Sequence, residues 1–299
     1  MFKKTTLARL ALIEVATFWG LSWVGFRALN EMGMSAMGAG VACCVSSAVF
    51  ALALAWGSIN KMAWRKWSWV LLGLMMAGAA LSNLGFTWGM VHGEVMRVML
   101  LFYLMPVWSG LMAHFILKEP TNWAGWLGIA LGLLGAGYML YDPALGAPYP
   151  ASAAEWSGLV AGFGSAVLNV CVKKTAGMAE NVRAFLQIFG AVLLGLVWLP
   201  FEAGSALPRA DSAGAALLVV LFMGAALLMT NRLYQFGVSN LTMHQAVVIF
   251  PFELVVGALS SWLLKGEVLN MQTWVGGGLI LGASMVSSWW GVTDDAERV

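Results

Sequence analysis

Residues 98–117 read "VMLLFYLMPVWSGLMAHFIL", an apolar run that contains no aspartate, glutamate, lysine or arginine. A helix needs about 20 apolar residues to cross the hydrocarbon core of a bilayer. Pro106 stands near the middle of this run, and a proline removes one backbone hydrogen bond and kinks a helix. The run therefore predicts a membrane-spanning helix with a kink near its centre.

The composition of the whole chain also indicates a membrane protein. Of its 299 residues, 61% are hydrophobic and only 10% are charged, whereas soluble domains carry about 25% charged residues. The apolar runs are about twice as long as the strands of a porin-like barrel, and they do not alternate with polar residues. We therefore expect a bundle of transmembrane helices.

Ten apolar runs divide the chain. They predict helices at 7–29, 36–57, 68–90, 95–117, 123–141, 155–173, 180–200, 214–236, 243–264 and 272–290. The two longest loops between these runs are 142–154 and 201–213, and the first of them is rich in proline and alanine. We interpret the chain as a first five-helix repeat (1–142), a linker loop (143–154), a second five-helix repeat (155–291) and a tail (292–299).

The two halves are similar in sequence at an offset of 148 positions. The stretch "SNLGFTWGMV" (82–91) aligns with "TNRLYQFGVS" (230–239), so that Asn83 matches Asn231. The stretch "KEPTNWAGWLG" (118–128) aligns with "GEVLNMQTWVG" (266–276) at the same offset. Because five is odd, the second half enters the membrane from the opposite side, which is an arrangement common in transporters. The predicted fold class is an all-α integral membrane protein with ten transmembrane helices in two inverted five-helix repeats.

The distribution of basic residues predicts the orientation. Most lysines and arginines fall in the loops on the side of the N-terminus, and basic loops stay in the cytoplasm. We expect a multi-pass protein of the inner (plasma) membrane with both termini in the cytoplasm. Helices 123–141 and 272–290 carry glycines four residues apart, a spacing that permits close helix contact. We expect these two helices to pack together through Gly128, Gly132, Gly278 and Gly282.

Three stretches resemble a known family. They are "FWGLSW" (18–23), "FYLMPVWSGLMAHFILKEP" (102–120) and "ELVVGALSSWLLKGE" (253–267), the last followed by a glycine-rich final helix. Together they resemble the drug/metabolite transporter superfamily, and in particular its ten-helix EamA branch, which includes the YddG-type amino-acid exporters. The resemblance covers essentially the whole chain and implies transport, although the superfamily carries amino acids, nucleotide-type metabolites and cations. One departure is that Leu254 stands where the first half has Pro106.

Two prolines and one carboxylate mark the predicted substrate path. Pro106 and Pro251 kink helices at corresponding places in the two halves, which favours a site between the halves. A kink that serves packing alone is the alternative. Glu253 lies two residues beyond Pro251, inside a predicted helix, where a carboxylate is costly unless it is paired or hydrated. It can bind a substrate ammonium or exchange a proton, or it can form a structural ion pair with Arg232.

Aromatic and amide side chains inside the predicted helices complete the candidate site. They can form an aromatic wall for a cationic or planar solute, or they can contact lipid and other helices. The predicted substrate-binding residues are Trp19, Trp23, Asn83, Trp88, Tyr103, Asn169, Asn231, Tyr234 and Glu253. Near the end of the bundle that we expect to face outward, Arg97 is predicted to pair with Glu94 or to receive a substrate carboxylate.

These features favour a secondary transporter. We expect export of small metabolites, such as amino acids or related compounds, across the inner membrane by alternating access. Drug or cation efflux and metabolite uptake by the same fold are the alternatives, and an intramembrane enzyme or a channel is less favoured. The chain lacks a P-loop and catalytic motifs, so we predict neither an enzyme nor a cofactor. The three histidines lack ligand spacing, so no metal site is predicted. The expected partners are a small-molecule substrate and the lipid bilayer, without nucleic acid; a monomer and a homodimer both remain open.

Overall fold

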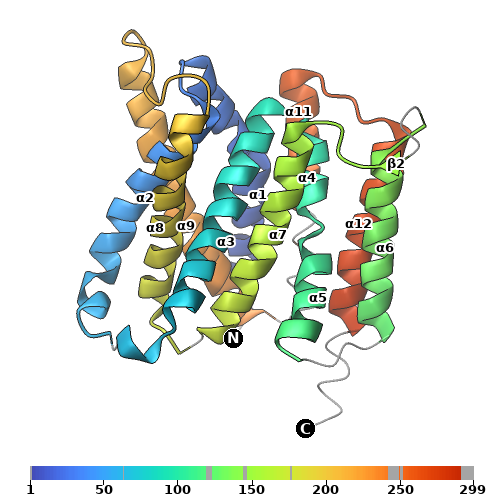
Figure 1. Ribbon diagram of the computed structural model, residues 1–299, viewed down its shortest axis with the longest axis horizontal. Coiled ribbons are helices and arrows are strands. Elements are labelled where there is room, and N and C mark those ends of the chain that lie inside the picture. Colours follow the sequence, from blue (N-terminus) through green and yellow to red (C-terminus); the bar gives the residue numbers. More distant parts are fainter. Residues whose placement is uncertain are drawn as a thin grey trace.

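The computed structural model describes residues 2–62, 64–118, 123–143, 147–175, 177–241, 249 and 252–290. This part of the chain is almost entirely helical (Figure 1). The long helices are α1 (Phe2–Glu31), α2 (Ala36–Ile59), α3 (Trp69–His92), α4 (Val95–Phe102), α5 (Met105–Ile116), α6 (Trp123–Leu140), α7 (Ala153–Lys174), α8 (Glu180–Trp198), α9 (Ala213–Asn240), α11 (Phe252–Lys265) and α12 (Met271–Trp290).

The helices match the apolar runs of the sequence. Within the described residues, eight segments are long and apolar enough to cross a membrane, and α4 with α5 counts as one of them. The helices α11 and α12 occupy the last two of the ten predicted positions, although residues 243–248, 250 and 251, including the predicted kink at Pro251, lie outside the described residues. The prediction of an all-α integral membrane protein is confirmed.

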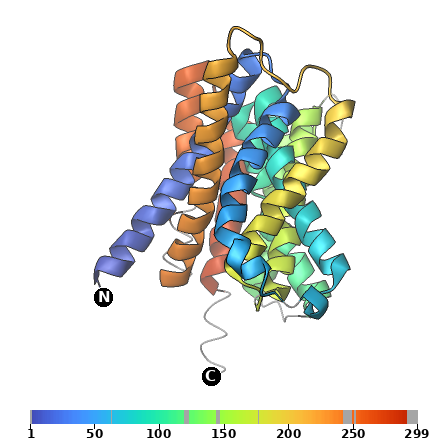
Figure 2. The same cartoon turned by 90° about the vertical axis from the view of Figure 1, so that its left-hand side faces the viewer.

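The two halves run in opposite directions through the bundle. Figure 2 shows α1 rising from the N-terminus, and Figure 1 shows α7, its counterpart at the offset of 148 positions, descending. The helix α1 begins and α12 ends at the same end of the bundle, which we call the N-terminal face (Figure 1). We call the opposite end the far face. The predicted tail, 292–299, lies outside the described residues.

Short elements occupy the loops. Two 3₁₀ turns, η1 (Trp64–Lys66) and η2 (Leu199–Phe201), follow α2 and α8. The linker between the repeats contains a small antiparallel pairing of β1 (Tyr141–Asp142) with β2 (Ala147–Pro148), which the sequence does not predict. The pairing lies at the far face, directly above α6 (Figure 1).

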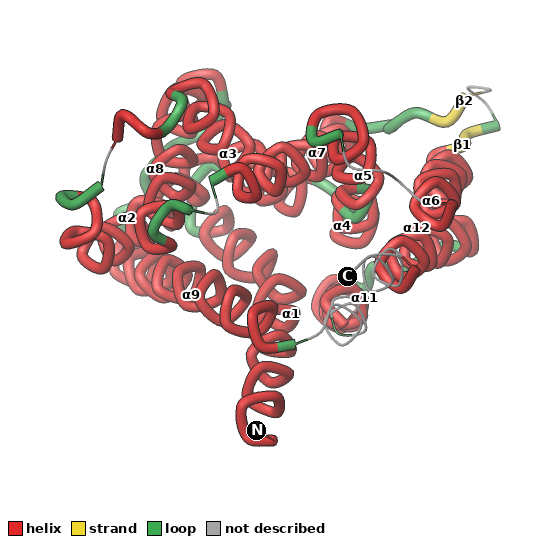
Figure 3. Tube along the Cα trace, turned by 90° about the horizontal axis from the view of Figure 1, so that it is seen from below, coloured by secondary structure: helices red, strands yellow, loops and turns green. Residues whose placement is uncertain are grey.

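The last helices of the two repeats, α6 and α12, lie side by side (Figure 3). Their backbones meet at Gly135 and Gly276: a Cβ atom at Gly276 would lie 2.6 Å from the Gly135 carbonyl oxygen. By contrast, no described atom outside the helix backbone lies within 4 Å of a Cβ placed at Gly278 or Gly282. The expected pairing of the two helices is correct, but the expected role of Gly278 and Gly282 is wrong, because these glycines face away from α6.

This contact predicts a site-specific effect on stability. The Gly276→Ala substitution forces a methyl group against a backbone carbonyl, and overpacking of this kind typically costs about 1–3 kcal/mol. The matched substitution Gly278→Ala meets open space and improves helix propensity by up to about 1 kcal/mol. We expect thermal unfolding in detergent to show a lower midpoint for Gly276→Ala only. Equal midpoints for the two variants would contradict this packing.

Candidate functional site

The span that contains the opening apolar run is broken in two. The helix α4 ends at Phe102 and α5 begins at Met105, while Tyr103 and Leu104 lie between them with ψ angles of 3° and −4°. Pro106 lies in the first turn of α5, where its missing N–H costs no helical hydrogen bond. Six of the eight residues of α4 are buried, whereas Val107 alone is buried in α5. The break therefore separates a tightly packed half-helix on the far-face side from one that is mostly half-buried.

The break brings the two repeats together through one hydrogen bond. The Tyr103 hydroxyl donates to Oε2 of Glu253 over 2.8 Å. Tyr103 belongs to the break in the first repeat, and Glu253 belongs to the first turn of α11 in the second. The sequence offers Arg232 as the structural partner of Glu253, but the structure gives the carboxylate a neutral hydroxyl instead. Arg232 lines a separate small recess together with Glu180.

Aromatic rings extend from this hydrogen bond across three helices. Trp19 of α1 lies edge-on to Phe86 of α3, with ring centroids 6.0 Å apart. Phe86 lies 5.0 Å from Phe102, which is 6.2 Å from Tyr103. The sequence prediction includes Trp19 and Tyr103 but omits Phe86 and Phe102. The repeat carried a signal for Phe86, because this residue matches the aromatic Tyr234 at the offset of 148 positions.

Met105 is the counterpart of Glu253 at the same offset, and two polar side chains of α7 reach it. The Ser165 hydroxyl lies 2.9 Å and the Asn169 amide nitrogen 3.5 Å from the Met105 sulfur. A thioether is only a weak acceptor. The first repeat therefore places a neutral group where the second repeat carries a carboxylate, with Asn169 beside it.

Other members of the predicted set contact different groups. The Asn83 amide donates to the Ala79 carbonyl of its own helix over 2.9 Å. The Trp88 ring stacks on His92 at 4.3 Å. These contacts are local to α3, so the structure does not link either side chain directly to Glu253.

The remaining predicted residues, Asn231 and Tyr234, belong to α9. Asn231 lines the small recess that also contains Glu180 and Arg232, between the ends of α2, α8 and α9. Tyr234 is 43% exposed. That Asn83 and Asn231 face one axis from two sides stays a prediction.

Trp23 is buried inside the bundle. It is 1% exposed, and its indole nitrogen donates to the Ser260 hydroxyl of α11 over 3.0 Å. The Arg27 guanidinium lies 5.0 Å from the centre of the same ring. Trp23 thus joins α1 to α11 and, in this conformation, presents no surface to a solute.

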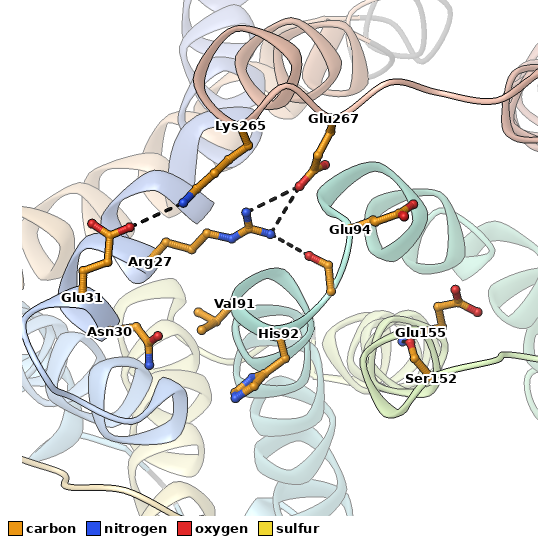
Figure 4. A pocket seen from close by; sticks show the side chains of 11 residues that line it. Arg27, Asn30, Glu31, Val91, His92, Glu94, Ser152, Glu155, Lys265 and Glu267 are labelled. Carbon is orange, nitrogen blue, oxygen red and sulfur yellow. Dashed lines mark hydrogen bonds and ion pairs between the residues drawn. The ribbon is translucent and has the colours of Figure 1, made fainter.

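A charged cavity of about 580 Å³ opens at the far face (Figure 4). Its polar lining consists of Arg27, Asn30, Glu31, His92, Glu94, Ser152, Glu155, Lys265 and Glu267. Arg27 lies at the centre of this group and donates to the Met90 and Gly93 carbonyls over 2.9 and 2.6 Å. It also forms an ion pair with Glu267 at 3.5 Å. The sequence prediction did not single out Arg27 or Glu267.

Arg97 has a different partner from the expected one. Its guanidinium lies 2.7 Å from the carboxylate of Glu155 in the first turn of α7, rather than beside Glu94. The other oxygen of Glu155 accepts a hydrogen bond from the Ala151 amide over 2.9 Å. The pair ties α4 to the start of the second repeat. No sequence pattern indicates this pair, because the two residues are far apart along the chain.

Glu267 lies just beyond the end of α11, outside the membrane-spanning segment. Burial raises the pKa of its carboxyl above the ordinary value, while the Arg27 guanidinium and the Val95 amide oppose this effect. The Val95 amide donates to Oε2 of Glu267 over 3.0 Å at the start of α4. Burial is the largest of these influences, and the Arg27 guanidinium is the main one that favours the ionised carboxylate.

Comparison with known proteins identifies the family. The model of the "EamA-like transporter family" matches residues 6–141 and again residues 152–289. The "Uncharacterized transporter YoaV" of Bacillus subtilis (strain 168) is 24% identical over 283 residues, which are 93% of either chain. A chain in a solved crystal structure shares 16% identity and the fold, with a TM-score of 0.60 over 95% of this chain and 96% of that one. The resemblance to the EamA branch is thereby confirmed, and the protein belongs to the EamA-like transporter family of multi-pass membrane transporters.

Proposed function

We propose that this protein is a secondary transporter that exports small metabolites with an ammonium group, such as amino acids or related compounds, across the inner membrane by alternating access. The observation that carries the proposal is the hydrogen bond between Tyr103 and Glu253. It joins the two repeats where the α4–α5 span is broken. Transporters of inverted-repeat architecture bind their solutes at such broken helices between the repeats.

The chemistry of the site favours a cationic group. Within the described residues, Glu253 forms no ion pair with a lysine or an arginine. The hydroxyl of Tyr103 supplies a hydrogen bond but no positive charge. A solute ammonium supplies the missing charge and three donors, and aromatic faces such as that of Trp19 attract cations. The carboxylate is then compensated only when the solute is bound.

Orientation and direction rest on other features. The basic residues gather toward the N-terminal face, so that this face is the cytoplasmic one by the positive-inside rule. The direction of export follows the resemblance to amino-acid exporters. The chain carries no P-loop, so we assign the driving force to a solute or ion gradient. Neither catalysis nor a cofactor is part of this proposal.

Efflux of organic cations is the second candidate, because the same carboxylate and aromatic rings can bind a quaternary or aromatic cation. The two candidates differ at the solute carboxylate. An amino acid carries both charges, so its site must also accommodate an anion, whereas an organic cation needs only Glu253 and the aromatic rings. Competition between the two solute classes therefore separates the candidates.

A flux assay tests the proposal. Purified protein in proteoliposomes is loaded with unlabelled amino acids, and the exchange of each labelled amino acid is followed. We expect saturable exchange that discriminates between L and D forms. Inhibition by organic cations, without any exchange of amino acids, would favour the second candidate. Flux that does not saturate with any solute would contradict a carrier mechanism.

A further inference from the structure

The helices α1 and α11 meet along a line that we call the α1–α11 seam. Its lower level is the hydrogen bond between Trp23 and Ser260, and the Ser260 hydroxyl also contacts the Gly20 carbonyl at 3.3 Å. Its upper level, one turn further along α1, is the ion pair between Arg27 and Glu267. The seam therefore joins a helix of the first repeat to a helix of the second.

The seam lies between the charged cavity and Glu253. Arg27 and Glu267 line the cavity itself. Below them, Trp23, Met90 and Met99 belong to one buried cluster and are 1%, 0% and 0% exposed. Glu253 precedes Ser260 by seven residues in α11, about two helical turns or ~10 Å along the axis. Along the seam, this buried apolar layer and the ion pair therefore lie between Glu253 and the cavity.

Arg27 holds several chain segments at the top of the seam. Its guanidinium donates to the Met90 and Gly93 carbonyls at the end of α3, and it pairs with Glu267 (Figure 4). Glu267 in turn accepts a hydrogen bond from the Val95 amide at the start of α4. Arg27 thus connects the ends of α1 and α3 with the end of α11, and Glu267 extends this connection to the start of α4.

We propose that Arg27 is the latch of a gate at the far face, formed by the α1–α11 seam, and that this gate is closed in the present conformation and opens when α11 separates from α1. The proposal rests on the proposed function only in placing the solute at Glu253. The second ion pair across the seam, Lys265 with Glu31 at 3.4 Å, is not the latch. Both of its side chains are substantially exposed, and solvated pairs contribute little.

The charged groups around Glu267 determine how the closed gate responds when Arg27 is removed. Arg27 of α1 and Glu94 of the α3–α4 connection face Glu267, and Glu31, His92, Glu155 and Lys265 line the same cavity. Removal of one partner from a buried pair leaves an uncompensated charge, whereas removal of both partners is much less disruptive. Without Arg27, the closed gate accommodates a neutral Glu267 better than an ionised one.

The sign of the pH dependence follows from this. Burial places the pKa of Glu267 in the closed gate above the ordinary value of 4.5 that it has when exposed to water. A carboxyl group binds its proton more tightly in the state where its pKa is higher, so low pH favours that state. This preference is lost as the pH rises through the higher of the two pKa values. In Arg27→Gln the gate should therefore be closed in acid and should open as the pH rises.

A thiol-accessibility experiment tests the latch without any solute. Met99 is fully buried and lies against α11, because a Cβ at Gly257 would lie 2.5 Å from its sulfur. The reporter Met99→Cys is placed in a chain whose three native cysteines are replaced by alanine. A membrane-impermeant cationic thiol reagent is then added from the far-face side, at several pH values.

We expect Arg27→Gln to raise the labelling rate at pH 8 at least about tenfold, which corresponds to a shift of about 1.4 kcal/mol in the opening equilibrium. Lowering the pH should reduce that rate. The double variant Arg27→Gln with Glu267→Gln should label as slowly as the parent at every pH, and this rescue also shows that the fold is intact. Arg27→Lys should be intermediate, and Lys265→Gln should match the parent.

Equal labelling of Arg27→Gln and the parent, or fast labelling of the double variant at all pH values, would overturn the latch. The proposed function can fail separately. If no ammonium-bearing solute is transported but labelling still follows this pattern, the gate stands and the solute assignment falls. If solutes are transported and labelling does not depend on Arg27, the function stands and the latch falls.

Discussion

Replacement of Glu253 by glutamine is expected to reduce solute exchange about ten- to hundredfold while leaving the protein folded. Hydrogen bonds to charged groups contribute about 1.5–3 kcal/mol, and each 1.4 kcal/mol corresponds to a factor of about ten. Glutamine keeps the size of the side chain and can still accept the Tyr103 hydroxyl. It cannot compensate the charge of an ammonium group, so the loss falls on solute binding rather than on packing.

The measurement is flux in proteoliposomes at several pH values, with the parent beside Glu253→Gln. Glu14→Gln is the matched control, because Glu14 is an exposed carboxylate on α1. We expect the control to retain the flux and the pH profile of the parent. Normal flux with an unchanged pH profile in Glu253→Gln would assign Glu253 a structural role.

The second large effect is expected at Trp23. Removal of a large buried side chain typically costs about 3–5 kcal/mol, because the surrounding structure fills the cavity only partly. Trp23→Ala also removes the hydrogen bond to Ser260. Between transmembrane helices, packing of this kind and interhelical hydrogen bonds drive association, so the α1–α11 contact should weaken.

Thermal or denaturant unfolding in detergent measures this effect. Trp69→Ala is the matched control, because Trp69 is 73% exposed at the start of α3, and exposed substitutions usually stay within about 0.5 kcal/mol. Trp23→Phe should fall between the parent and Trp23→Ala. If Trp23→Ala and Trp69→Ala shift the midpoint equally, Trp23 does not carry the contact between the repeats.

The sequence predicts the spans well because the bilayer constrains them. Each crossing needs a long apolar run, and within the described residues the runs correspond to the helices and half-helices of the structure. The break in the fourth span does not lie at the proline itself. It falls at Tyr103 and Leu104 rather than at Pro106, because a proline is well accommodated in the first turn of the helix that follows.

The contacts of the site are harder to predict, because they join residues far apart in sequence. Charge alone points from Glu253 to Arg232, whereas the partner found is the neutral hydroxyl of Tyr103, 150 residues away. Amide side chains are difficult to assign for a different reason. The Asn83 side chain donates to the backbone of its own helix, and the sequence does not distinguish this local contact from a role in the site. Trp19 and Tyr103 of the aromatic series are predicted from the sequence, and the repeat offset is the signal that could have added Phe86.

Loop-end ion pairs escape prediction for a related reason. Arg27 and Glu267 lie 240 residues apart, and each stands at the end of a span where interfacial charges are ordinary. Their pairing depends on how α11 packs against α1, and the periodicity of a single helix does not encode that. The same holds for the contact of Gly135 with Gly276, which differs by a few residues from the glycine pairs expected from spacing.

The proposed function requires the junction of Tyr103 and Glu253 to bind the ammonium group of the transported solute. Equilibrium binding of a labelled amino acid to purified protein in lipid nanodiscs tests it most directly, with competition by the same molecule lacking its amino group. We predict that the parent binds the amino acid and ignores the deaminated competitor, and that Glu253→Gln loses binding. Equal binding to the parent and to Glu253→Gln, or equal competition by the deaminated analogue, would contradict the claim.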